Sequence, residues 1–138
     1  MSFKSIMNRH CYLTLFLITA AVVLSGCNSE GTRPVTGIVS LDGEPLSGVI
    51  VTYYPIGGGR GNSNAQTDDQ GQYALRYTST AKGAIPGEYK VLISKTKRMP
   101  NGVEKELLPA RYNTKSELVA EIKNRGENVY NFDLTSED

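Results

Sequence analysis

The amino-acid sequence predicts an all-β protein folded as an antiparallel β-sandwich. Three observations lead to this prediction. Apolar residues recur at every second position in short runs, turns rich in glycine, proline, asparagine and aspartate separate the runs, and no segment shows a sustained helical period. Because a single sheet would leave one apolar face in water, we expect the runs to form two packed sheets.

The first predicted strands cover residues 35–41, residues 49–54 and, more weakly, residues 65–67. In the first two runs the odd-numbered residues are mostly apolar, so these side chains are predicted to face the core. Asp42 and Gly43 supply a turn between them, because glycine takes positive φ without steric cost.

Four further runs complete a predicted seven-stranded sandwich; they are residues 73–77, 89–94, 117–122 and 130–134. A tight turn at residues 68–71 is expected to join the third and fourth runs as a hairpin.

The alternating pattern fails between Thr96 and Asn113, where Met99-Pro100-Asn101-Gly102 interrupts it. We expect an irregular crossover here, lying over one end of the sandwich. Excursions of this kind are common places of contact with partners.

The N-terminal segment is predicted to be a lipoprotein signal peptide. Lys4 and Arg9 precede an apolar run over residues 12–24, which is shorter than the roughly 20 residues of a membrane-spanning helix. Leu24-Ser25-Gly26-Cys27 then resembles the lipobox of bacterial lipoproteins. This resemblance implies cleavage between Gly26 and Cys27 and acylation, palmitate included, of Cys27. The alternative is an ordinary secretory signal followed by a chance cysteine.

The predicted organisation therefore has three parts: a signal peptide over residues 1–26, a lipidated tether over residues 27–34, and one β-sandwich domain over residues 35–138. The tether is expected to hold the exported domain on a membrane of the bacterial cell envelope through Cys27. Asn28 follows the cysteine, where aspartate commonly retains lipoproteins in the inner membrane, so the resemblance implies the outer membrane.

Composition excludes several functions for the remaining 112 residues. They carry 13 basic and 14 acidic residues, interspersed along the chain, so no nucleic-acid partner is expected. His10 and Cys11 fall in the signal peptide, which removes the commonest general base and metal ligand. No catalytic residue, metal site or cofactor is predicted. Asp68 and Asp69 invite a calcium site, but the loop lacks the full ligand set of a calcium loop, and a hairpin turn explains them better.

The motifs of the domain resemble the carboxypeptidase regulatory-like, or transthyretin-like (prealbumin-like), family. They are Gly37-x-Val39-x-Leu41-Asp42-Gly43-x-Pro45-Leu46-x-Gly48-Val49-x-Val51, Thr67-Asp68-x-x-Gly71-x-Tyr73 and Pro86-Gly87-x-Tyr89-x-Val91. The resemblance implies a Greek-key-type sandwich. Leu108-Pro109-Ala110-Arg111-Tyr112 is similar to a segment of small lipoproteins from planctomycete-type bacteria that bear this domain.

Family members serve as accessory, adhesive or structural modules, so the resemblance implies a lipid-anchored binding or structural module without catalysis of its own. One alternative is an envelope protein that binds carbohydrate or peptide, with Tyr54 and Tyr112 as the residues that contact the ligand. A weaker one is a hydrolase like the transthyretin-related enzymes that act on 5-hydroxyisourate. Those enzymes use histidines and end in Tyr-Arg-Gly-Ser, whereas this chain ends in Thr135-Ser136-Glu137-Asp138.

Overall fold

The computed structural model describes residues 31–59 and 61–137, so Gly26, Cys27 and the whole predicted signal peptide lie outside the described residues. The described elements, in chain order, are β1 (Thr36–Leu41), β2 (Glu44–Pro45), β3 (Ile50–Pro55), β4 (Ser63–Gln66), β5 (Gln72–Ala74), β6 (Gly87–Ser94), β7 (Thr96–Arg98), β8 (Glu104–Glu106), the short 3-10 helix η1 (Ala110–Tyr112), β9 (Val119–Ile122) and β10 (Phe132–Leu134).

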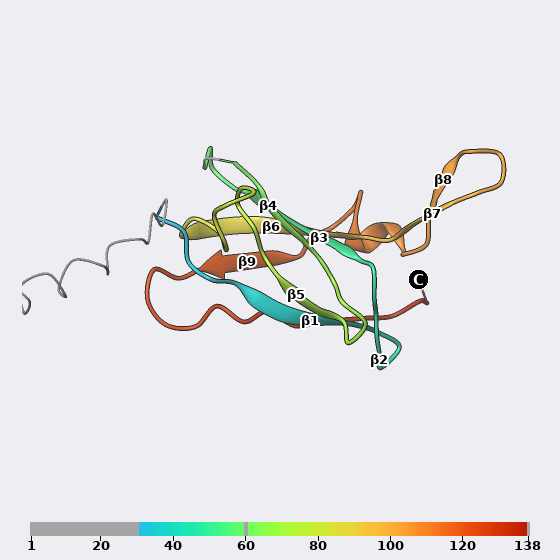
Figure 1. Ribbon diagram of the computed structural model, residues 1–138, viewed down its shortest axis with the longest axis horizontal. Coiled ribbons are helices and arrows are strands. Elements are labelled where there is room, and N and C mark those ends of the chain that lie inside the picture. The colour runs from blue at the N-terminus through green and yellow to red at the C-terminus, as the bar shows by residue number, and fades with distance from the viewer. Residues whose placement is uncertain (1–30, 60, 138) are drawn as a thin grey trace, which may run out of the picture.

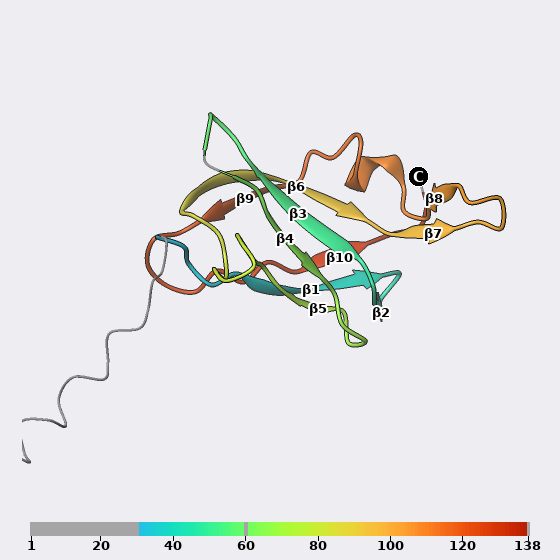
Figure 2. The same ribbon diagram turned by 45° about the horizontal axis from the view of Figure 1, so that its top comes forward.

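Two sheets pack face to face as the layers of the molecule (Figure 1 and Figure 2). In the first sheet, β1 lies between β10 and β2, and β5 also pairs with β1. The second sheet has the order β4-β3-β6-β9 and is antiparallel throughout. The prediction of an all-β protein is confirmed, and the two layers agree with a β-sandwich.

The core consists of the side chains that the alternating pattern predicted to face inward. Val39, Val51, Tyr53, Val91 and Ile93 have no exposed surface, while their neighbours along each strand face solvent or the sheet rim. Burying a side chain of this size stabilises the fold by about 1.5–3 kcal/mol. The hydrophobic contact between the layers is therefore the main source of stability.

The first sheet corrects the expectation of a wholly antiparallel sandwich. β10 pairs with β1 in parallel, with Val39 opposite Phe132 and Leu41 opposite Leu134. Parallel neighbours need a long crossover connection, which the second sheet supplies because it lies between β1 and β10 in the sequence.

The hairpin expected around residues 68–71 is present in part. Asp68 N donates to the Gln72 carbonyl at 2.9 Å, and Asn64 and Arg76 exchange backbone hydrogen bonds as an antiparallel bridge. Between these points the two arms separate, because β4 pairs with β3 and β5 pairs with β1. The turn thus carries the chain from one sheet to the other. Its two ends are held by different layers: the Thr67 carbonyl accepts a hydrogen bond from Gly48 N at 3.1 Å, and the Gly71 carbonyl accepts one from Val39 N at 2.8 Å.

The segment between Thr96 and Asn113 is more regular than the sequence predicted. β7 and β8 form a two-stranded hairpin, and η1 follows. Figure 1 shows this hairpin at the end of the molecule opposite the start of the described chain. The strands were missed because every residue of β7 is exposed and the residues of β8 are charged, so no apolar alternation marks them.

A chain of buried tyrosines joins the layers. The Tyr73 hydroxyl of β5 donates a hydrogen bond to the Tyr130 carbonyl at 2.7 Å. The Tyr53 hydroxyl of β3 lies 3.0 Å from the Tyr73 hydroxyl. Because the single proton of the Tyr73 hydroxyl is already used, Tyr53 is the donor in this second hydrogen bond. The Tyr53 ring also lies 6.0 Å from that of Tyr89 and 6.4 Å from that of Tyr130. Burial raises the pKa of Tyr73 to about 12 and raises the pKa of Tyr53 as well.

Gly37 allows the Tyr130 backbone to approach β1. A Cβ atom built on Gly37 would collide with the Tyr130 carbonyl and would lie 2.8 Å from the Tyr73 ring. The absence of a side chain at this position is therefore a condition for the tyrosine chain to form.

We expect Gly37→Ala to lower the free energy of unfolding by about 3 kcal/mol, since the added methyl group must displace backbone as well as a buried ring. Urea denaturation followed by tyrosine fluorescence measures this. Thr36→Ala, which removes exposed atoms from the same strand, is the control and should change stability by less than about 0.5 kcal/mol. Equal stability of Gly37→Ala and the unchanged protein would contradict the close approach.

We also expect stability to fall in alkali. An unfolded tyrosine loses its proton near pH 10, whereas folded Tyr73 keeps its proton up to about pH 12, so the unfolded state binds fewer protons in this window. The contribution, on the order of 2 kcal/mol, is complete below pH 10 and lost as the pH rises through 12. Urea unfolding across this window measures the slope. Tyr73→Phe should flatten it, and Tyr54→Phe, at an exposed ring, is the matched control.

Candidate functional site

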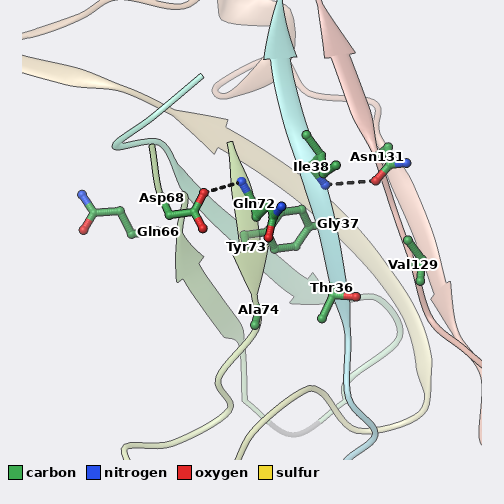
Figure 3. Close-up of a pocket in the computed structure, with 10 residues that line it drawn as sticks. All are labelled: Thr36, Gly37, Ile38, Gln66, Asp68, Gln72, Tyr73, Ala74, Val129 and Asn131. Atoms are coloured by element: carbon green, nitrogen blue, oxygen red, sulfur yellow. Dashed lines mark hydrogen bonds between the residues drawn. The ribbon is translucent and has the colours of Figure 1, made fainter. Parts of the chain in front are cut away.

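A groove of about 700 Å³ lies on the outer face of the first sheet (Figure 3). Strands β1 and β5 form its floor, the turn after β4 forms one wall, and the segment before β10 forms the other. The residues around it are Thr36, Gly37, Ile38, Gln66, Asp68, Gln72, Tyr73, Ala74, Val129 and Asn131. Its volume is within the range of small-ligand and peptide sites.

The lining combines exposed apolar groups with amides. Ile38 of β1 is 42% exposed, and Val129, in the segment before β10, is 54% exposed, so two large aliphatic side chains of the lining face solvent. Gln66, Gln72 and Asn131 add amide groups, each with donor and acceptor atoms. This combination can bind an extended chain that presents both backbone polar groups and apolar side chains.

Two of the polar groups in the groove already hold the backbone in place. Asn131 Oδ1 accepts a hydrogen bond from Ile38 N at 3.0 Å, and Asp68 Oδ1 accepts one from Gln72 N at 2.9 Å (Figure 3). Asp68 Oδ1 also accepts one from Gln70 N at 2.9 Å. The walls of the groove are therefore fixed by the fold.

The two aspartates considered for an ion take part in the turn. Asp68 closes it through the hydrogen bonds just described, and Asp69 Oδ1 accepts a hydrogen bond of 3.4 Å from Ser47 Oγ. Within residues 31–59 and 61–137, no three histidine, cysteine, aspartate or glutamate side chains group as metal ligands. No helix among these residues is long and apolar enough to cross a membrane.

Tyr54, one of the two predicted contact residues, lies on the outer face of the second sheet. It is 45% exposed and borders a groove of about 300 Å³. The other lining residues are Thr52, Leu92, Ser94, Glu106, Asn113 and Thr114. An exposed ring beside hydroxyl and amide groups is a suitable surface for stacking a sugar.

Tyr112, the second predicted contact, lines a different groove with Arg111, Lys115, Glu117 and Leu118. Its hydroxyl accepts a hydrogen bond from Thr135 N at 3.0 Å, and the Arg111 guanidinium lies 4.7 Å from its ring centre. Burial opposes ionisation of Tyr112, but its contacts with Thr135 and Arg111 outweigh this and lower its pKa. Tyr112 thus holds the C-terminal segment and does not share a surface with Tyr54.

Glu106 is a structural residue within the segment that the sequence predicted to be an irregular crossover. Its Oε2 accepts a hydrogen bond of 2.5 Å from Ser94 Oγ, and its Oε1 accepts bonds of 3.0 Å from the backbone N–H groups of Lys95, Leu107 and Leu108. Burial raises the pKa of Glu106, but these hydrogen bonds outweigh it and leave the pKa lowered. The carboxylate thereby attaches the base of the β7–β8 hairpin to the end of β6.

Comparison with known proteins gives little further guidance. No family model matches the chain, and no curated protein matches it. Among solved structures, a 9R-lipoxygenase from Cyanothece PCC8801 matches with 14% identity and a TM-score of 0.39, over 95% of this chain and 20% of the lipoxygenase. The chain therefore spans about a fifth of the length of that protein.

This comparison corrects one prediction. The expectation that the chain is not an enzyme is withdrawn, because the matching solved structure is an enzyme. At this TM-score the match assigns no reaction, substrate or catalytic residue to the chain.

Proposed function

We propose that this chain is a lipid-anchored module of the bacterial cell envelope that binds a partner there or contributes to envelope structure. The lipobox ending at Cys27 supports the anchor. The groove on the outer face of the first sheet supports binding, and the single observation on which it depends is the joint exposure of Ile38 and Val129 beside amide groups. The partner that fits this lining is an extended segment of an envelope protein.

We also infer membership of the carboxypeptidase regulatory-like family, with seven core strands connected in a Greek-key-type order, and attachment to the outer membrane. The turn motif supports the family. Asp42 and Gly43 have φ values of 52° and 86°, the pair of positive angles that defines a type I′ turn. Asn28 supports the choice of membrane.

Arg33 fixes the start of the described chain to one end of the sandwich, and this is the end nearest the proposed anchor at Cys27. Its backbone exchanges hydrogen bonds with Ala84 at 2.7 and 3.0 Å, and its guanidinium donates to the Asn124 side-chain and backbone oxygens at 2.6 and 2.8 Å. The chain from Cys27 to Thr32 spans at most about 18 Å. An acylated Cys27 would therefore keep this end of the sandwich near the bilayer.

A second candidate function is carbohydrate binding at the Tyr54 surface, favoured by the exposed ring beside the hydroxyl groups of Thr52 and Ser94. Stacking against an aromatic ring and hydrogen bonds to neighbouring hydroxyls are complementary to a sugar.

For the anchored binding module, we expect the full chain, with a photoreactive residue replacing Val129, to give one discrete cross-linked protein in intact cells and to fractionate with membranes. Cys27→Ala should move the protein to the soluble fraction and lose the cross-link, because the anchor supplies the local concentration. Mass spectrometry identifies both the acyl group and the captured protein.

Cys11→Ala is the matched control for the cysteine change, and a photoreactive residue at Thr80, exposed but outside the groove, is the control for position. Unchanged membrane fractionation of Cys27→Ala would contradict the anchor. Equal cross-linking from both positions would contradict the groove as the binding site.

For the carbohydrate candidate, we expect Tyr54→Ala to weaken binding on an array of envelope glycans by about two- to tenfold, because a stacked ring contributes about 0.5–1.5 kcal/mol. Tyr112→Phe, which leaves a ring in the other groove, should bind as the unchanged protein does. Absence of glycan binding by the unchanged protein would rule this candidate out.

A further inference from the structure

The β7–β8 hairpin has one face on which two lysines stand behind an apolar tip. Lys97 and Lys105 are directly opposite each other, and Met99 and Val103 follow them toward the tip on the same face, because strand side chains alternate. Met99 is 38% exposed and Val103 is 59% exposed. The turn beyond them, residues 100–102, carries no charge. We call the four side chains the lysine face.

The backbone of the tip makes its hydrogen bonds within the hairpin. Met99 N donates to the Val103 carbonyl at 2.8 Å, and Gly102 N donates to the Met99 carbonyl at 2.9 Å. Val103 N donates to Asn101 Oδ1 at 3.1 Å, and Pro100 has no N–H group. These groups therefore need no water. A turn with this property can enter the edge of a lipid layer, where an unsatisfied backbone group is costly.

The hairpin carries an excess of positive charge that the rest of the described chain lacks. Residues 95–106 contain four basic and two acidic residues, whereas the other described residues contain eight basic and ten acidic ones. Arg98 stands opposite Glu104 on the other face of the hairpin, and the Glu106 carboxylate is held at the base by Ser94 and backbone N–H groups. The excess therefore lies with the lysines of the hairpin.

Charged groups on the segments beside the base of the hairpin do not add to this excess. Arg111 and Lys115 line one groove with Glu117, and Arg111 also binds the C-terminal segment that carries Glu137. Two cations and two carboxylates balance there. Within the hairpin, like charges directly opposite on paired strands repel each other. An anionic surface bound to the lysine face removes this repulsion.

The hairpin projects beyond the two packed sheets, at the end of the molecule opposite the start of the described chain (Figure 1 and Figure 2). Glu106 attaches its base to the end of β6, so the tip points in a direction fixed by the fold. The apolar side chains lie at the tip and the lysines behind them. A bilayer offers acyl chains at one depth and phosphate groups behind them, which is the same order, whereas an anionic polymer offers charge alone.

We propose that the β7–β8 hairpin docks on a phospholipid bilayer that carries negative charge. Met99 and Val103 enter the boundary between headgroups and acyl chains, and Lys97 and Lys105 bind lipid phosphates at the depth of the headgroups. This contact is separate from the acyl group proposed at Cys27 and does not depend on it. Because the described chain starts at the opposite end, an anchored domain that also docks is attached at both ends.

The proposal is tested on residues 28–138, which include every described element and the core from Val35 to Leu134. We expect the purified protein to sediment with phosphatidylglycerol vesicles at about 50 mM salt and to be released at about 500 mM, where screening is strong. Neutral phosphatidylcholine vesicles should bind it at least about tenfold more weakly.

The double variant Lys97→Gln/Lys105→Gln should bind phosphatidylglycerol vesicles about thirtyfold more weakly, which is the loss of two contributions of roughly 1 kcal/mol. Lys90→Gln/Lys123→Gln, which removes two exposed lysines outside the hairpin, is the matched control and should bind like the unchanged protein. Circular dichroism confirms that each variant is folded.

Insertion of the tip is measured with a dye, because residues 28–138 contain no cysteine and one can be introduced for labelling. An environment-sensitive dye on Val103→Cys should shift its emission to the blue on phosphatidylglycerol vesicles. The same dye on Val119→Cys, at an exposed valine of β9, should not.

Failure of the unchanged protein to bind phosphatidylglycerol vesicles would overturn the proposal, as would equal binding by Lys97→Gln/Lys105→Gln. Binding without an emission shift at position 103 would also overturn it, since the hairpin would then recognise negative charge alone, as on an anionic polysaccharide or an acidic protein.

Discussion

The close approach of the Tyr130 backbone to Gly37 is the constraint on which the rest of the sandwich depends. It brings the Tyr130 carbonyl within reach of the Tyr73 hydroxyl, which in turn receives the hydrogen bond of Tyr53 from the facing sheet. One polar chain thereby crosses a core that is otherwise apolar. Since buried hydroxyls without partners are costly, the three tyrosines favour one arrangement of the layers over others that would bury the same apolar surface.

The same approach creates the groove on the outer face. Thr36 N donates to the Asn128 carbonyl and Tyr130 N to the Thr36 carbonyl, but the next amide, Ile38 N, is satisfied by the Asn131 side chain. Regular pairing resumes only where Val39 stands opposite Phe132. The C-terminal segment keeps one parallel register beside β1 on both sides of this point, but its backbone pairing is interrupted at Ile38, whose side chain is exposed beside the segment.

The proposed anchor, the groove and the β7–β8 hairpin lie in different parts of the molecule. The described chain enters at the end held by Arg33, the groove lies along the outer face of the first sheet, and the hairpin attached by Glu106 extends from the opposite end. A molecule held at one end can therefore present the groove to neighbouring proteins and the hairpin to a lipid surface. Local concentration on a membrane favours weak contacts of this kind.

The sequence by itself determined the strands that bury a face, because a period of two specifies both strand type and inward side, as it does for Val39, Val51 and Val91. It missed the hairpin, whose strands bury nothing and so leave no apolar pattern. Only the tertiary structure decided the parallel pairing of β10 with β1, the passage of the chain between sheets at residues 68–71, and the groove. These depend on contacts between segments distant in sequence, and alternation carries no information about which strands become neighbours.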